Sequence, residues 1–170
     1  MSTVERTLVL PHKKVQQKVQ RIAHQIVEEN FNQSQIILIG IKNRGFEFAQ
    51  QLFSIIQNIE GAPTPSLESI SLSKDNLTES NIILSIDMKK LDDKCVVLID
   101  DVLNSGKTLM YATRHILNAD VAKLSTAVLV DRKHRKYPIR ADIAGLTLST
   151  TVQEHISVQF ENGETNVYLV

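Results

Sequence analysis

Two adjacent carboxylates followed by a small polar loop are the clearest chemical feature of this 170-residue sequence. Asp100 and Asp101 come directly after the apolar run 95–99, and the loop 104–108 follows close behind. Backbone N–H groups and hydroxyls of such a loop can bind a phosphate at the point where a helix begins. Carboxylates at the end of a strand can accept hydrogen bonds from neighbouring sugar hydroxyls. The pattern therefore predicts a site for a phosphorylated sugar.

Two other interpretations of this segment are weaker. An isolated pair of aspartates is more often a capping or solvated pair, and it is the adjoining loop that favours a binding site here. The ending Gly106-Lys107-Thr108 also matches the Walker A loop, but that pattern requires a glycine five positions before Gly106, where this chain has Asp101. The sequence therefore argues against a nucleoside triphosphatase.

A basic turn follows an earlier apolar run. The run 36–39 ends at Gly40, and the turn that follows carries Lys42 and Arg44. A turn of this kind is often only part of the solvated surface. Cations and backbone donors just after a parallel strand also suit a second anionic group, which makes this turn a second candidate binding segment.

Alternating strands and helices have to position these two turns. Apolar runs of strand length alternate along the chain with apolar residues at helical spacing. The predicted elements are a helix over 11–30, a strand over 36–39, a helix over 46–56, a strand over 95–99, a helix over 106–118 and a strand over 124–130. This order predicts an α/β fold, an open and mostly parallel sheet flanked by helices, with ligands at the carboxyl ends of its strands.

The remaining segments depart from this alternation. Gly61, Pro63 and Pro65 predict a break after the second helix, and strands over 67–73 and 81–87 are joined by a polar, mobile loop. Near the C-terminus, apolar residues alternate on either side of Asn162-Gly163, which predicts a terminal hairpin. We expect a single domain over residues 1–170.

The composition argues against several classes of protein. The 19 Lys and Arg equal the 19 Asp and Glu, so no general field draws the chain to nucleic acid or to an anionic membrane. The single cysteine, Cys95, lies in an apolar run and excludes a disulfide framework. Without a leader or a run of about 18 apolar residues, we expect a cytoplasmic protein and no membrane partner. The five histidines lack metal-ligand spacing, which argues against a transition-metal site.

The segment 96–108 resembles the signature with which type I phosphoribosyltransferases bind 5-phosphoribosyl 1-diphosphate (PRPP). The resemblance implies the fold of that family, with a small hood beside the sheet. It implies that Asp100 and Asp101 hold the ribose 2- and 3-hydroxyls and act in catalysis, and that 104–108 holds the 5-phosphate. It also implies Mg²⁺ as a cofactor, bound near the two aspartates through substrate oxygens and water rather than directly. The residues assigned to PRPP in this way are Val102, Leu103, Asn104, Ser105, Gly106, Lys107 and Thr108.

Further stretches are similar to the PyrR branch of that family, the pyrimidine-operon regulators and uracil phosphoribosyltransferases. These stretches read RIAHQI at 21–26, GIKNRG at 40–45 and VDRKHRKYPIRAD at 130–142. The likeness implies that the first turn binds pyrophosphate, that Arg44 acts in catalysis, and that a non-proline cis peptide occurs within 40–45. The pyrophosphate residues assigned in this way are Ile41, Lys42, Asn43 and Arg44.

The same likeness implies how the base is held. It assigns Asp131, Arg132 and the backbone of Ile156 to the base, and it assigns Lys74 to a mobile loop that closes over the site. The implied reaction converts uracil and PRPP to UMP and pyrophosphate. The implied assembly is a homodimer or a larger homo-oligomer.

The chain also departs from the PyrR branch. Asn43 stands where the branch usually has Thr, Lys133 stands where it has Gly, and 146–149 replaces a stretch that usually contains Lys, Asn and Pro. Two alternatives to a uracil enzyme therefore stay open: a phosphoribosyltransferase for another nucleobase, and an RNA-binding regulator that senses UMP and PRPP. Because affinity for RNA comes largely from excess Lys and Arg, we expect sequence-specific RNA binding to be weak or absent.

Overall fold

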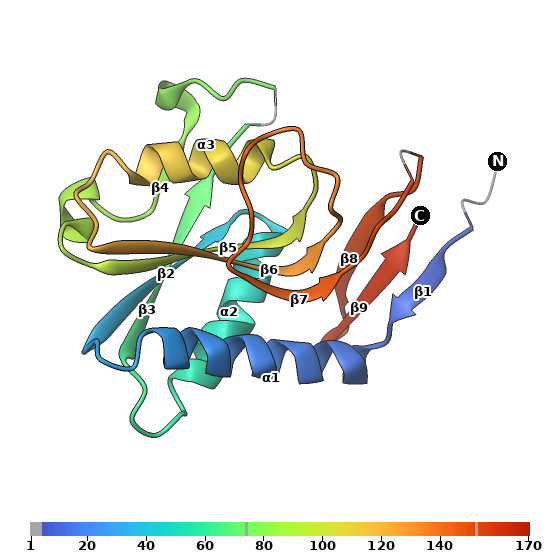
Figure 1. Cartoon of the computed structure of the whole chain (residues 1–170), viewed down its shortest axis with the longest axis horizontal. Coiled ribbons are helices and arrows are strands. Elements are labelled where there is room, and N and C mark those ends of the chain that lie inside the picture. The colour runs from blue at the N-terminus through green and yellow to red at the C-terminus, as the bar shows by residue number, and fades with distance from the viewer. Residues whose placement is uncertain (1–4, 74, 152) are drawn as a thin grey trace.

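The computed structural model describes residues 5–73, 75–151 and 153–170. Its main sheet has the strand order β4-β3-β2-β5-β6-β7, in which only β4 runs antiparallel to its neighbour (Figure 1). A smaller antiparallel sheet, with the order β1-β9-β8, lies beside it. The elements are β1 (Thr7–Leu10), α1 (His12–Glu29), β2 (Gln35–Ile41), α2 (Arg44–Ile56), β3 (Thr64–Ser71), β4 (Ile83–Leu84), β5 (Cys95–Leu103), α3 (Lys107–Ile116), β6 (Lys123–Asp131), β7 (Ile143–Thr147), β8 (Ile156–Glu161) and β9 (Glu164–Leu169), with short 3-10 helices at Glu79–Asn81 and Met88–Leu91.

Helices cover both faces of the main sheet. Helices α1 and α2 lie on one face and α3 lies on the other (Figure 1). Strands β2 and β5 are therefore buried on both sides, which explains why their sequences read as continuous apolar runs. The predicted open, mostly parallel sheet flanked by helices is confirmed. Among the described residues, no helix combines the length and apolar character needed to cross a bilayer.

Strand β5 is longer than its apolar run predicted. We expected the strand to end at residue 99, but it continues through Asp100 and Asp101 to Leu103. The extension follows from pairing with β6, where Val102 lies opposite Val130 and Leu103 opposite Asp131. Tertiary pairing thus overrides the weak strand propensity of aspartate.

Other strand boundaries differ from the prediction. Strand β3 begins at Thr64, so Pro65 lies inside it. The N–H of Thr64 donates to Ser34 O on the side of β2, so the nitrogen of the next residue, Pro65, faces the opposite edge of β3. On that edge β4 pairs with β3 only at Ile70 and Ser71, so Pro65 interrupts no hydrogen bond between strands. The predicted strand over 81–87 is reduced to two residues of β4. Strands β1 and β7 were not predicted, because each is a short edge strand with few buried residues.

The smaller sheet forms the hood that the family resemblance implied. The hairpin of β8 and β9 turns at Asn162 and Gly163, as predicted, and both residues have the positive φ typical of a tight hairpin turn. His12 at the start of α1 fixes this sheet to the main body: its Nδ1 accepts from the N–H of Thr165 at 2.9 Å, and its own N–H donates to Asn166 Oδ1 at 2.8 Å. The hood is thereby held beside the carboxyl ends of the main strands.

Candidate functional site

A cavity of about 480 Å³ lies at the carboxyl ends of β2 and β5. Its walls come from both turns that the sequence singled out, namely 41–45 after β2 and 100–109 after the apolar part of β5. Leu72, Leu77 and Ile156 complete the lining. The structure therefore brings together all residues assigned to PRPP and to pyrophosphate. Lys74 lies outside the described residues.

The turn after β2 presents exposed polar groups to the cavity. Lys42, Asn43 and Arg44 are exposed, and the Lys42–Asn43 peptide is cis, as the resemblance implied. Gly45 lets this turn approach β5 closely, because a Cβ atom there would lie 2.8 Å from Asp100 Oδ1 and 3.0 Å from Ile99 O. The backbone of this turn thus lies directly against Asp100.

The loop between β5 and α3 forms the opposite part of the cavity. Gly106 has φ +85° and precedes the first residue of α3, so the loop turns sharply into the helix N-terminus. The carbonyl of Ser105 accepts from the N–H groups of Lys136 at 2.8 Å and Tyr137 at 3.1 Å. These contacts fix the loop from behind and leave residues 105–108 lining the cavity. This geometry suits an anion at a helix N-terminus.

Asp100 and Asp101 lie between the two turns. Both are partly exposed and line the cavity, and the N–H of Asp101 donates to Asp100 Oδ1 at 2.9 Å. Lys42, Arg44 and Lys107 also line the cavity. The carboxylates thus lie between cationic residues on either side of the cavity. This arrangement matches a ligand whose centre carries neutral hydroxyl groups and whose two ends carry anionic groups.

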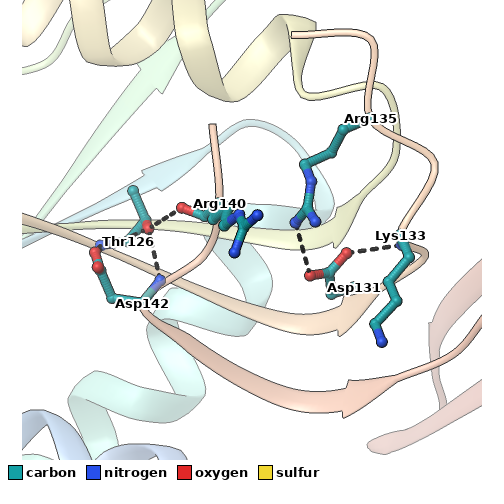
Figure 2. Close-up of polar contacts among 6 residues, drawn as sticks. All are labelled: Thr126, Asp131, Lys133, Arg135, Arg140 and Asp142. Carbon is teal, nitrogen blue, oxygen red and sulfur yellow. Dashed lines mark hydrogen bonds and ion pairs between the residues drawn. The ribbon is translucent and has the colours of Figure 1, made fainter. Parts of the chain in front are cut away.

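The segment 132–142 that follows β6 does not line the cavity. Figure 2 shows polar contacts within this segment and with β6. Asp131 is buried; it accepts from the N–H of Lys133 at 2.8 Å and forms an ion pair with Arg135 at 3.4 Å. Within β6, Thr126 exchanges hydrogen bonds of 2.8 and 3.0 Å with Asp142 near the start of β7. Of the residues assigned to the base, the structure brings only Ile156 to the cavity wall, so contacts of Asp131 and Arg132 with a base stay a prediction.

Sequence reasoning missed the residues that support the loop 104–108. A Cβ atom at Gly106 would lie 2.8 Å from Ile139 Cγ2 and 3.6 Å from Tyr137 Cβ. Both residues belong to the irregular segment between β6 and β7, where no periodic pattern indicates a packing partner. The one indication of buried packing in this part of the sequence is the cluster of Tyr137, Pro138 and Ile139 within an otherwise charged stretch.

A charged contact also orders the segment that leads to Ile156. Glu154 Oε2 accepts from the N–H of Thr151 at 2.8 Å. This hydrogen bond from the Thr151 backbone, helped by the side chain of Thr151 and by the charge of Arg132, holds the pKa of Glu154 below its ordinary 4.5. Because folding lowers the pKa of Glu154, the contact stabilises the segment fully at pH values above 4.5. This stabilisation is lost as the pH falls through the lowered pKa of the folded state.

Lys133 occupies a backbone conformation that favours glycine. Its φ is +55°, in the left-handed region that glycine adopts most readily. We expect Lys133→Gly to raise the free energy of unfolding by roughly 0.5–1 kcal/mol, because removing Cβ relieves more strain than the added freedom of the unfolded chain costs. Lys133→Ala is the control, since it removes the charge and keeps Cβ. Urea unfolding of both variants measures the effect, and an equal rise in the two would assign it to charge.

Comparisons with known proteins agree with this geometry. A model of the phosphoribosyl transferase domain matches residues 6–161 of the chain. A curated protein named bifunctional protein PyrR, from Pelotomaculum thermopropionicum, is 34% identical over an alignment that covers 98% of this chain and 96% of the relative. The protein of the same name from Clostridium acetobutylicum is 37% identical, with coverage of 94% and 96%.

Solved structures share the fold. A hypoxanthine-guanine phosphoribosyltransferase from Bacillus anthracis superimposes with a TM-score of 0.74 at 23% identity, over 98% of this chain and 100% of that one. The hypoxanthine phosphoribosyltransferase of Trypanosoma cruzi gives a TM-score of 0.76 at 15% identity, with coverage of 96% and 95%. The parallel sheet with its hood is thus the fold of type I phosphoribosyltransferases. From the domain match and the identity to proteins of that name, the chain belongs to the phosphoribosyltransferases and, among them, to the PyrR family.

Proposed function

We propose that this enzyme transfers the phosphoribosyl group of PRPP to uracil, with UMP and pyrophosphate as products. The observation that carries the proposal is that one cavity gathers a carboxylate pair, a helix-opening loop and a basic turn. These groups correspond to the ribose hydroxyls, the 5-phosphate and the pyrophosphate of PRPP. The preference for uracil is supported by the identity to proteins named PyrR, whose branch the sequence also resembles.

The order of the strands suggests how PRPP lies in the cavity. Residues 104–108, at the N-terminus of α3, would hold the 5-phosphate through backbone N–H groups and hydroxyls, with Val102 and Leu103 forming the wall behind. Asp100 and Asp101 would accept hydrogen bonds from the ribose hydroxyls. The turn of Ile41, Lys42, Asn43 and Arg44 would hold the pyrophosphate.

The proposed reaction breaks the bond between C1 of PRPP and the pyrophosphate oxygen and forms a bond from C1 to N1 of uracil. Positive charge develops on the ribose, as in glycoside cleavage. Asp100 and Asp101 favour that charge and orient the sugar, while Lys42 and Arg44 stabilise the negative charge of the leaving group. N1 of uracil loses its proton as the new bond forms, and the departing pyrophosphate or solvent takes up that proton. No covalent intermediate with the protein is needed.

Mg²⁺ fits this donor set. The Asp100 and Asp101 carboxylates offer oxygen atoms at the cavity wall, which suits a hydrated Mg²⁺ bound mainly by PRPP oxygens and water. No group of three or more His, Cys, Asp or Glu side chains among the described residues could hold a metal ion by itself. When bound, Mg²⁺ would neutralise charge on the pyrophosphate.

The base would enter on the side of β6 and the hood. Ile156 lines the cavity there, and Asp131 and Arg132 lie behind it at the end of β6. Closure of the loop that contains Lys74 would exclude water, which competes with uracil as a nucleophile.

A panel of free bases tests the proposed function. With PRPP and Mg²⁺, we expect pyrophosphate release to be fastest with uracil, and we expect mass spectrometry to identify UMP as the product. Cytosine, hypoxanthine and guanine are the comparison bases. Efficient use of hypoxanthine or guanine without use of uracil would instead make the chain a purine phosphoribosyltransferase.

An RNA-binding regulator is the second candidate function, because the relatives carry the name bifunctional protein PyrR. Lys13, Lys14 and Arg21 on α1 are exposed, as are Lys133 and Lys136. The chain has no excess of cations, however, so we predict weak or no sequence-specific binding. Titration of the chain with the leader RNA of its own operon and with a scrambled RNA, each with and without UMP, measures the affinity for RNA.

Tight, UMP-enhanced binding to the leader alone would overturn the prediction of weak binding. Light scattering on the same sample measures the oligomeric state, which we expect to be a dimer or a larger assembly.

A further inference from the structure

Arg132 is buried although it carries a full charge beside the cavity. Only 4% of the residue is exposed. A guanidinium has five N–H donors, and each of them here has an acceptor. The acceptors are Thr150 Oγ1 at 2.8 Å from Nε, Asn104 Oδ1 at 3.1 Å and His155 Nδ1 at 3.4 Å from Nη1, and Thr151 O at 3.2 Å and Glu154 O at 2.6 Å from Nη2. The side chain of Arg132 therefore has no donor left for a base.

The contact with Asn104 fixes the orientation of a side chain that does line the cavity. A guanidinium can only donate, so it selects the carbonyl oxygen of the Asn104 carboxamide. The NH₂ group of the same carboxamide then points away from Arg132. Asn104 is exposed and lines the cavity, and its side chain makes no other hydrogen bond within residues 5–73, 75–151 and 153–170. The NH₂ group is thus available to a ligand.

The strand order indicates which part of the ligand meets this NH₂ group. The pyrophosphate turn follows β2 on one side of β5, whereas Arg132 follows β6 on the other side. A displacement at C1 places the nucleophile opposite the leaving group. Because the side chain of Asn104 reaches toward β6, it lies at the end of the cavity where the base attacks. Ile156 lines the same end.

We propose that Asn104 is a specificity-determining residue for the base and that Arg132 is a positioning residue that acts through it. The NH₂ group of Asn104 donates a hydrogen bond to the acceptor next to the attacking nitrogen, which in uracil is O2 beside N1. Arg132 does not touch the base; it keeps the carboxamide from rotating. This inference rests on the proposed transfer to uracil, and it changes the predicted role of Arg132 from a base contact to a support.

The test compares uracil with 2-thiouracil, in which a weakly accepting sulfur replaces O2. We expect the wild-type chain to prefer uracil in kcat/KM by about tenfold, the worth of one hydrogen bond. Asn104→Ala and Arg132→Met should each reduce this preference to about twofold or less, and the double variant should lose no more than either single one. Arg132→Lys keeps the charge without the planar guanidinium. Its preference for uracil should lie between those of the wild-type chain and of Arg132→Met. Thr150→Val, which disturbs the same segment without touching Asn104, should keep the preference.

Each outcome decides a separate statement. A preference unchanged in Asn104→Ala would show that Asn104 does not meet the base. A preference lost in Asn104→Ala but kept in Arg132→Met would show that Arg132 does not position the carboxamide. Loss of the preference in Thr150→Val as well would assign the effect to general disorder of the segment. If the wild-type chain makes no UMP from uracil, the proposed function fails before this inference is reached.

Discussion

Asp100→Asn and Asp101→Asn are each expected to lower turnover by roughly 100-fold or more while the fold is kept. Both carboxylates line the cavity between the turn 41–45 and the loop 104–108, where the proposed mechanism develops positive charge on the ribose. Asparagine retains an oxygen acceptor, so the hydrogen bond from the N–H of Asp101 to Oδ1 of residue 100 can persist. The loss should therefore appear mainly in kcat rather than in stability.

Steady-state kinetics with saturating PRPP, together with circular dichroism, measures this effect. Glu28→Gln is the matched control, because it removes one carboxylate charge from an exposed position on α1. Its turnover should equal that of the wild-type chain. Wild-type turnover in both aspartate variants would remove the carboxylates from the mechanism.

Gly106→Val is expected to weaken PRPP binding by at least about 100-fold, because two or three charge-assisted hydrogen bonds to the 5-phosphate are lost together. A side chain at residue 106 conflicts with φ +85° and meets Ile139 Cγ2 at 2.8 Å from its first carbon. The loop must then move, and its N–H groups no longer converge on one anion.

Isothermal titration calorimetry with PRPP measures this loss in a variant shown to be folded. Gly61→Val separates backbone strain from loop geometry, because Gly61 has φ +76° with open space around it and lies outside the cavity lining. That control should lose stability and keep PRPP affinity. If Gly106→Val bound PRPP as tightly as the control, the loop would not hold the 5-phosphate.

The elements that place the two turns were predictable because their signals are local. Val15, Val19, Ile22 and Ile26 mark the buried face of α1 within its own sequence, and each buried central strand is a continuous apolar run. The turns themselves follow these strands directly, so the cavity residues of 41–44 and 100–108 were predictable as well. The polar chemistry of a turn after a parallel strand is readable without knowledge of distant contacts.

The base side of the site was less predictable because it depends on contacts between distant segments. The partners of Arg132 lie 18 to 28 residues away along the chain, and Tyr137 and Ile139 support a loop about 30 residues earlier. The extension of β5 depends on β6 in the same way. Resemblance assigned Arg132 to the base, and that assignment stays a prediction. The five acceptors of its guanidinium, which only the structure shows, are the basis of our proposal that it acts through Asn104.

The most direct test of the central claim is a crystal structure of the chain with UMP. We predict the 5-phosphate of UMP on the backbone of 105–108 at the N-terminus of α3, and the ribose hydroxyls within hydrogen-bond distance of Asp100 and Asp101. The uracil ring should lie on the β6 side of the cavity, beside Ile156 and Asn104. A phosphate bound away from 105–108, or a ribose that contacts neither aspartate, would contradict the assignment of this cavity to phosphoribosyl transfer.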